Sequence, residues 1–125
     1  MTTVYKAGRC LVVHTTSAGR DALGQAIALV PGSKKSCVAQ MKGLIARLAD
    51  FGYLRSPDQW NAEGNGLYAV KARCGLRAYG WFASESSGKV FVIGHATLKK
   101  KQKADPQDLQ KTQDEREQYL ARGLK

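Results

Sequence analysis

The segment from Lys89 to Lys103, KVFVIGHATLKKKQK, combines a proton-transfer residue with a cluster of positive charge. Its apolar, β-branched first part predicts a buried strand that ends near His95. The lysines that follow are Lys99, Lys100, Lys101 and Lys103. A histidine titrates near neutral pH and lysines bind a polyanion by charge, so the segment suits chemistry on a phosphodiester. Each half alone has an ordinary interpretation, because strand-end histidines are often structural and lysine runs are often solvated surface.

The charge of the whole chain supports the same partner class. Lys and Arg number 20 against 10 Asp and Glu, which gives a formal net charge of +10. Residues 1–103 hold 16 basic and 5 acidic side chains, a net of +11, whereas residues 104–125 hold 4 and 5, a net of −1. The positive charge therefore lies in the body of the chain, which favours RNA, DNA or a strongly acidic protein as partner. Solubility is the alternative explanation for this charge.

Length and residue types bound the class of protein. A chain of 125 residues with 43% hydrophobic residues predicts a single domain over residues 1–125 with a real core. Cys10, Cys37 and Cys74 are odd in number and contain no CxxC pair, which argues against a disulfide scaffold and a zinc site and suits a reducing compartment. No cluster of Asp, Glu or His has metal-ligand spacing, and no apolar run has membrane-spanning length. We therefore expect a cytoplasmic protein without metal, cofactor or membrane partner.

Hydrophobic periodicity predicts an α+β fold. Residues 10–15 (CLVVHT) predict a short strand, and residues 17–30 predict a helix that ends at Pro31-Gly32. A second helix is expected from Ser36, as its N-cap, to a stop at Gly52. The predicted order is a helical hairpin followed by an antiparallel sheet.

The second half of the chain predicts most of that sheet. Residues 53–66 are expected to form a polar connection, and residues 67–73, 76–83 and 89–96 to form a three-stranded meander. A C-terminal helix should follow, with Asp105 as N-cap and Pro106 in its first turn. Its thin apolar stripe is expected to contain Leu109, Thr112, Gln113, Arg116 and Leu120.

Four phrases of this region together resemble a known family. They are GLYAVK at residues 66–71, LRAYGWF at 76–82, VIGHATLKKKQK at 92–103, and DPQDL at 105–109, which leads to Arg116 and Tyr119. In this order they resemble the phage-derived, Gp49-like and HigB-type branch of the RelE/ParE toxin superfamily. The resemblance covers residues 34–122.

The resemblance implies a small α+β toxin with helices packed on one face of a curved antiparallel sheet. It also implies that a cognate antitoxin protein neutralises the toxin. RelE-like and HigB-like members cut messenger RNA on the ribosome, whereas ParE-like members share the fold and poison DNA gyrase. The expected function is therefore a ribosome-dependent mRNA endonuclease that uses metal-independent acid–base chemistry. A gyrase poison and an inactive phage-derived nucleic-acid-binding domain are the alternatives, since fold alone does not determine activity.

RNA cleavage by the 2′-hydroxyl needs a base, an acid and cations near the phosphorane. By the resemblance, Arg77 corresponds to the strand arginine of the RNases, Lys71 to a strand lysine that acts as base or charge stabiliser, and Lys99 or Lys100 to a late-strand cation. His95 is the expected proton carrier. If Phe91 and Ile93 face the core, however, simple alternation would bury His95 with them unless a bulge turns it away.

The expected nucleic-acid-binding residues surround these. Arg73 should project from the same sheet face as Lys71, because the two lie two residues apart. Tyr79 could stack on a base, donate its hydroxyl or simply pack in the core. Lys100, Lys101 and Lys103 could follow the RNA backbone. Asp58 falls near the position of a general base in some relatives, although an Asp after a proline commonly forms a turn. His14 is interpreted as structural.

Overall fold

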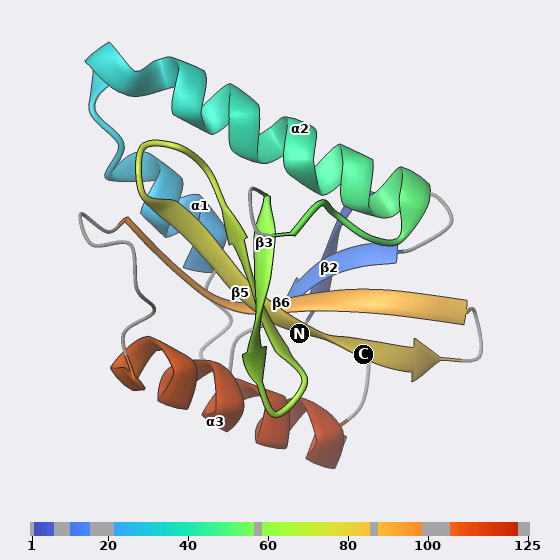
Figure 1. The fold of residues 1–125 in the computed structure, drawn as a ribbon. Coiled ribbons are helices and arrows are strands. Elements are labelled where there is room, and N and C mark those ends of the chain that lie inside the picture. Colours follow the sequence, from blue (N-terminus) through green and yellow to red (C-terminus); the bar gives the residue numbers. More distant parts are fainter. Residues whose placement is uncertain are drawn as a thin grey trace.

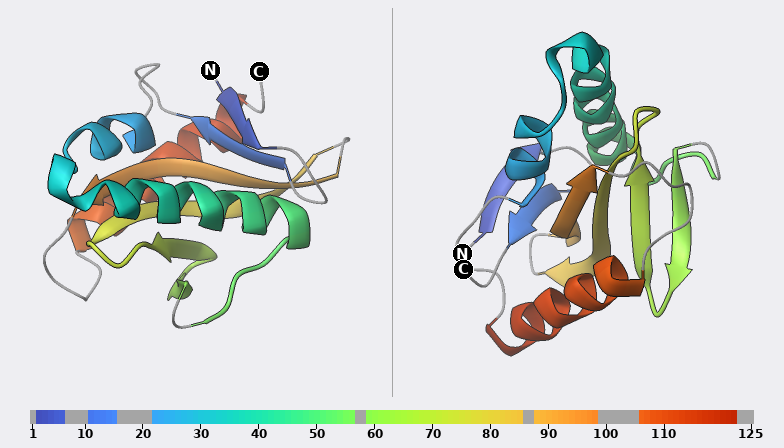
Figure 2. Two further views of the ribbon diagram at one scale, coloured as in Figure 1. Left: turned by 90° about the horizontal axis from the view of Figure 1, so that it is seen from above. Right: turned by 90° about the vertical axis from the view of Figure 1, so that its left-hand side faces the viewer.

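A computed structural model describes residues 2–6, 11–15, 22–56, 59–85, 88–98 and 106–122 of the chain. These residues form a sheet between two layers of helix (Figures 1 and 2). Helices α1 (Ala22–Ala28) and α2 (Lys35–Phe51) cover one face of the sheet, and α3 (Pro106–Arg122) covers the other. The expected α+β class, with two helices before the meander and one after it, is confirmed.

The sheet has six strands in the order β1-β2-β6-β5-β4-β3. Every neighbouring pair is antiparallel except β2 and β6, which are parallel. The strands are β1 (Thr2–Lys6), β2 (Leu11–Thr15), β3 (Trp60–Gly64), β4 (Leu67–Lys71), β5 (Leu76–Glu85) and β6 (Gly88–Leu98). The meander of β4, β5 and β6 and the N-terminal strand β2 were expected from the sequence, whereas β1 was not.

Strand β3 corrects the expectation of a polar connection over residues 53–66. Its sequence, WNAEG, has one large apolar residue, Trp60, whose ring stacks on Tyr68 of β4 with centroids 4.6 Å apart. Trp60 is buried, while the residues after it alternate between partly buried and exposed. One aromatic anchor therefore holds an otherwise polar strand at the sheet edge, which residue composition alone does not reveal.

The helix ends agree with the sequence only in part. Helix α2 ends as expected at Gly52, which has φ of 80° and donates its backbone N–H to Leu48 O at 2.7 Å. It begins at Lys35, however, and the residue before it, Lys34, makes no side-chain capping bond, so the expected Ser36 cap is wrong. Helix α1 ends at Ala28, two residues before the predicted end at residue 30, and residues 17–21 lie outside the described residues. In α3, Thr112 is buried as expected, but Leu120 is 67% exposed.

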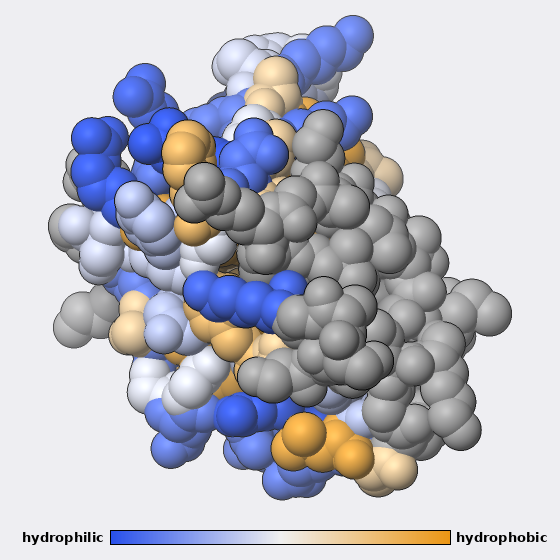
Figure 3. Space-filling model, turned by 90° about the vertical axis from the view of Figure 1, so that its right-hand side faces the viewer, coloured by the Kyte–Doolittle hydropathy of each residue, from blue (hydrophilic) through white to orange (hydrophobic). Residues whose placement is uncertain are grey.

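Two apolar clusters lie on opposite faces of the sheet. The larger lies under α1 and α2 and includes Met41, Leu48, Leu76, Phe91 and Ile93. The smaller lies under α3 and contains Leu67, Trp81, Val90, Val92 and Tyr119. On the side of the molecule drawn in Figure 3, hydrophilic side chains surround smaller hydrophobic areas. Large apolar side chains that are exposed include Phe51 and Tyr53 near the end of α2.

Candidate functional site

A β-bulge in β6 determines where His95 points. Gly80 of β5 is opposite Ile93, but the preceding residue, Tyr79, is opposite His95, so Gly94 is the additional residue of the bulge. Ile93 belongs to the cluster under α1 and α2, whereas His95 contacts Asp108 of α3. The bulge therefore turns His95 away from the larger core, which decides between the two orientations left open by the sequence.

His95 is held by an acidic residue of α3. Its Nε2 lies 2.9 Å from Oδ1 of Asp108, and the two side chains are 17% and 13% exposed. An ionised carboxylate only accepts hydrogen bonds. Nε2 therefore carries a proton and donates a hydrogen bond to Oδ1 of Asp108. In a neutral imidazole this leaves Nδ1 as the proton-accepting nitrogen. The pair thus fixes the orientation that a general base would need.

Sequence reasoning did not select Asp108 as a site residue. A signal was available, because Asp108 lies in the first turn of α3, where the helix dipole favours an acidic side chain. Its backbone carbonyl also accepts a hydrogen bond from the Thr112 hydroxyl at 2.8 Å. Both residues are buried against the sheet, so the polar side of the first turns of α3 faces inward.

Tyr79 lies beside His95 on the same sheet face. The two rings are stacked, with centroids 5.9 Å apart and an interplanar angle of 23°. Tyr79 is 0% exposed, and its hydroxyl makes no hydrogen bond of good geometry within the described residues. A nucleic-acid base cannot reach this ring in the conformation observed. Tyr79 instead packs against the imidazole of His95 within the protein.

Burial also determines the protonation of Tyr79. Removal from water raises the pKa of Tyr79 to about 12, the nearby carboxylate of Asp108 adds to the rise, and the guanidinium of Arg77 opposes it. The guanidinium is close enough to influence the phenol, although the hydroxyl lacks a hydrogen bond of good geometry. Tyr79 therefore remains a neutral phenol at physiological pH.

Arg77 and Lys71 bring two positive charges to the sheet face that carries His95 and Tyr79. They are directly opposite each other on β5 and β4, so their side chains leave the same face of the sheet. Arg77 is buried, at 6% exposed, whereas Lys71 is partly exposed. With the oxygen and nitrogen of the Asn61 amide assigned so that both find partners, this oxygen accepts a hydrogen bond from Nζ of Lys71 at 3.0 Å.

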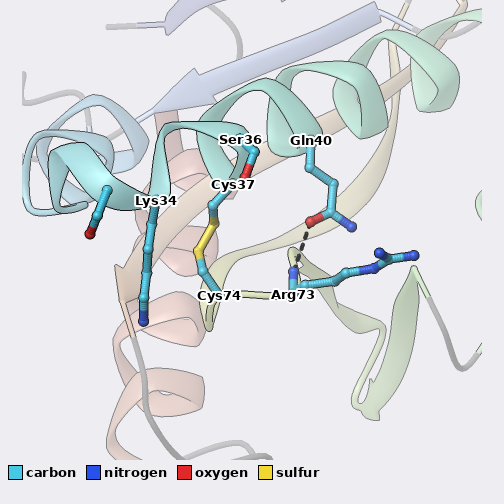
Figure 4. Close-up of a pocket in the computed structure, with 7 residues that line it drawn as sticks. Lys34, Ser36, Cys37, Gln40, Arg73 and Cys74 are labelled. Atoms are coloured by element: carbon cyan, nitrogen blue, oxygen red, sulfur yellow. Dashed lines mark hydrogen bonds between the residues drawn. A yellow bond between two sulfur atoms is a disulfide. The ribbon is translucent and has the colours of Figure 1, made fainter.

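Arg73 lies apart from this cluster. The expectation that it shares a sheet face with Lys71 is wrong, because β4 ends at Lys71 and Arg73 belongs to the turn before β5. Its backbone N–H donates to Gln40 Oε1 of α2 at 2.9 Å (Figure 4). The side chain is exposed and lines a separate pocket beside α2.

Several expected site residues cannot be placed. Lys99, Lys100, Lys101, Lys103, Asp58 and Asp105 lie outside the described residues, and for His14 only the backbone, in β2, is described. What the structure does bring together is a base-and-cation cluster on the face under α3. Its members are Lys71, Arg77, Tyr79, His95 and Asp108, from four different elements.

Comparison with known proteins gives no family for this chain. No protein-family model matches it, and a search of curated proteins gives no match. Within the described ranges, no three His, Cys, Asp or Glu side chains are grouped so that they could hold a metal ion. No helix in that part of the chain is long and apolar enough to cross a membrane.

Proposed function

We propose that this protein is a toxin of the RelE/ParE type, with a cognate antitoxin protein, and that it cleaves messenger RNA on the ribosome in the cytoplasm. The observation that carries the proposal is the placement of His95, Arg77 and Lys71 on one sheet face. A histidine oriented by a carboxylate can serve as the base, and an arginine and a lysine as the cations, in cleavage by the 2′-hydroxyl. The strongly positive body of the chain supports a polyanionic partner.

In this mechanism the imidazole of His95 takes the proton of the attacking 2′-hydroxyl, and the 2′-oxygen bonds to phosphorus. The bond from phosphorus to the 5′-oxygen breaks, and this leaving oxygen takes up a proton from solvent. Asp108 accepts a hydrogen bond from Nε2–H and so keeps Nδ1 available as the base. Arg77 and Lys71 stabilise the charge that grows on the phosphorane, and Arg77 can hold two phosphate oxygens at once. The stacked ring of Tyr79 limits the movement of the imidazole.

A second candidate is nucleic-acid binding without cleavage. The burial of Arg77 and the engagement of His95 with Asp108 favour it, because a phosphate must reach the guanidinium for catalysis. Under this alternative the cluster would serve only to dock α3 on the sheet, and RNA would be held by exposed lysine and arginine side chains.

The decisive experiment is single-turnover cleavage of mRNA on ribosomes by Arg77→Ala. Loss of one preorganised charge-stabilising group should lower the cleavage rate by a factor of roughly 10²–10³, with far less change in ribosome affinity. Arg77→Lys should recover only part of the rate, because a point charge lacks the bidentate geometry. Arg47→Ala, which removes an exposed arginine over the ring of Phe51, is the matched control and should cleave at the wild-type rate.

Because Arg77 is buried, each variant should first be shown by thermal unfolding to be folded at the assay temperature. Arg77→Ala that is folded and cleaves at the full rate would contradict the nuclease proposal. Wild-type toxicity with intact mRNA and blocked DNA gyrase would replace it with a gyrase poison, and RNA binding without cleavage would support the second candidate.

A further inference from the structure

A disulfide between Cys37 and Cys74 joins α2 to the turn between β4 and β5 (Figure 4). The two Cα atoms are 5.8 Å apart, and 37 residues separate the cysteines in sequence. The expectation from the sequence that the cysteines form no disulfide scaffold is wrong for this pair. The spacing of the cysteines in the sequence gives no sign of the bond, because only the fold brings the two residues together. Cys10 lies outside the described residues.

The disulfide borders an open pocket of about 670 Å³. The other lining residues are Ser33, Lys34, Ser36, Gln40 and Arg73, so two of them are cationic and none is acidic. Figure 4 shows the sulfur–sulfur bond between the side chains of Lys34 and Arg73. An attacking thiolate would therefore approach through a positively charged opening, which favours the anionic nucleophile.

The two sulfur atoms differ in accessibility and in their surroundings. Cys37 is 4% exposed, whereas Cys74 is partly exposed, so an external thiolate reaches Cys74 more easily. Attack at Cys74 expels the sulfur of Cys37, which lies in the first turn of α2 and lines the same pocket as Lys34. The end of a helix dipole and an adjacent cation both stabilise a thiolate, so Cys37 is the better leaving group.

We propose that Cys37–Cys74 is a thiol–disulfide exchange site for a dithiol. One thiolate of the dithiol bonds to Cys74 Sγ, breaks the sulfur–sulfur bond and releases the thiolate of Cys37, which takes up a proton. The second thiol of the dithiol, after losing its proton, then bonds to the first and releases Cys74 as a thiolate. The disulfide gains two electrons and the dithiol becomes the oxidised partner.

Reduction removes a covalent tie without dismantling the turn itself. Within the turn, Ala72 N–H donates to Leu76 O at 2.9 Å and Gly75 N–H donates to Ala72 O at 3.1 Å. The bond from Arg73 N–H to Gln40 then remains between the turn and α2. Since Lys71 and Arg77 flank this turn, reduction also acts on the cationic side of the site; that last consequence rests on the proposed function.

The first test locates the exchange. The oxidised full-length protein is treated with glutathione under native conditions, and the mixed disulfide is identified by mass spectrometry of its peptides. The adduct should form at Cys74, and dithiothreitol should reduce the bond faster than the protein unfolds globally. An adduct at Cys37, reduction that waits for global unfolding, or three free thiols in the untreated protein would each overturn the proposal.

The second test measures the consequence. Amide hydrogen exchange at Arg73 should accelerate at least about tenfold on reduction, and the melting temperature should fall by roughly 10 °C. The Cys37→Ser/Cys74→Ser variant should reproduce both changes without reductant, and Cys10→Ser should reproduce neither. Unchanged exchange and melting on reduction would overturn the proposal. If neither redox form cleaves mRNA but these changes occur, the proposed function fails and the exchange site stands.

Discussion

The face of the sheet under α1 and α2 buries apolar side chains, whereas the face under α3 buries a row of polar and charged groups beside a small apolar cluster. Under α2, residues such as Met41, Leu48 and Phe91 are 0% exposed and belong to one continuous core. Under α3, the strands that carry Trp81 and Val92 continue to Arg77 and His95.

The difference between the faces lies in how each stabilises the fold. Apolar burial is favourable in proportion to area, so the α2 face stabilises the protein without specific partners. Buried polar groups are costly unless they are hydrogen-bonded or paired, so the α3 face depends on particular contacts such as His95–Asp108. A protein keeps such groups in its interior at a cost in stability, which is one reason to look for function there.

The largest expected effect comes from a substitution on the apolar face of the sheet, which lies under α1 and α2. A Cβ atom at Gly80 would lie 2.2 Å from the backbone oxygen of Val92 and 2.8 Å from the ring of Phe91. A backbone atom in the middle of a sheet cannot move aside, so Gly80→Ala should lower the free energy of unfolding by about 3 kcal/mol or more. Gly43→Ala, at an open helical position in α2, should instead raise it by about 0.5 to 1 kcal/mol. Urea denaturation of both variants tests this, and equal effects would contradict it.

The next prediction concerns Tyr79 on the face of the sheet under α3, called the polar face below. Its pKa is raised from 10.0 to about 12 in the folded protein, so the folded state retains the phenolic proton after the unfolded chain has lost it. The contribution of Tyr79 to the free energy of unfolding is fully present below about pH 10 and is lost as the pH rises through about 12. The free energy of unfolding should fall by about 2 to 3 kcal/mol over this range.

Tyr79→Phe should remove this part of the pH dependence. At neutral pH it should change stability by less than about 1 kcal/mol, because the contact of the buried hydroxyl with Arg77 lacks good hydrogen-bond geometry. Tyr53→Phe, at an exposed ring, is the control. The measurement is the free energy of unfolding as a function of pH, from about pH 9 to about pH 12. A wild-type curve that parallels that of Tyr79→Phe would contradict the prediction.

The elements that bury continuous apolar stripes were predictable from the sequence. Helix α2 follows from the helical spacing of residues such as Met41, Leu44 and Leu48, and strands β4 to β6 follow from their own apolar residues. The spacing of apolar residues directly indicates which face of an element is buried. The polar face was less predictable, because burial of Arg77 and Tyr79 depends on where α3 docks. That position follows from no local pattern, and Leu120, assigned to the packing stripe, is exposed.

The direction of His95 shows what a local signal can and cannot give. A glycine within a strand pattern often marks a bulge, and Gly94 directly precedes His95. Alternation without that bulge would have placed His95 with Ile93 in the larger core. The glycine indicates that a bulge can form, but the partner that His95 then meets, Asp108, comes from another element and is visible only in the fold.

The smallest expected effect tests the contact that most clearly distinguishes the polar face. Asp108→Ala leaves Nε2 of a partly buried His95 without its acceptor and removes an acidic residue from the first turn of α3. Loss of such a hydrogen bond and of the favourable interaction with the helix dipole should lower the free energy of unfolding by about 1 to 2 kcal/mol.

Asp114→Ala is the matched control, because Asp114 is an exposed residue of the same helix that accepts a hydrogen bond from Gln110 at 2.9 Å. Its loss should cost less than about 0.5 kcal/mol, as is usual for exposed helical pairs. Nitrogen NMR of His95 gives a second readout, since the carboxylate of Asp108 selects the tautomer with the proton on Nε2. Asp108→Ala should populate both tautomers, whereas Asp114→Ala should leave the wild-type signal. If the two variants are equally stable and His95 keeps one tautomer in both, the polar face does not depend on this contact, and an orienting role for Asp108 is wrong.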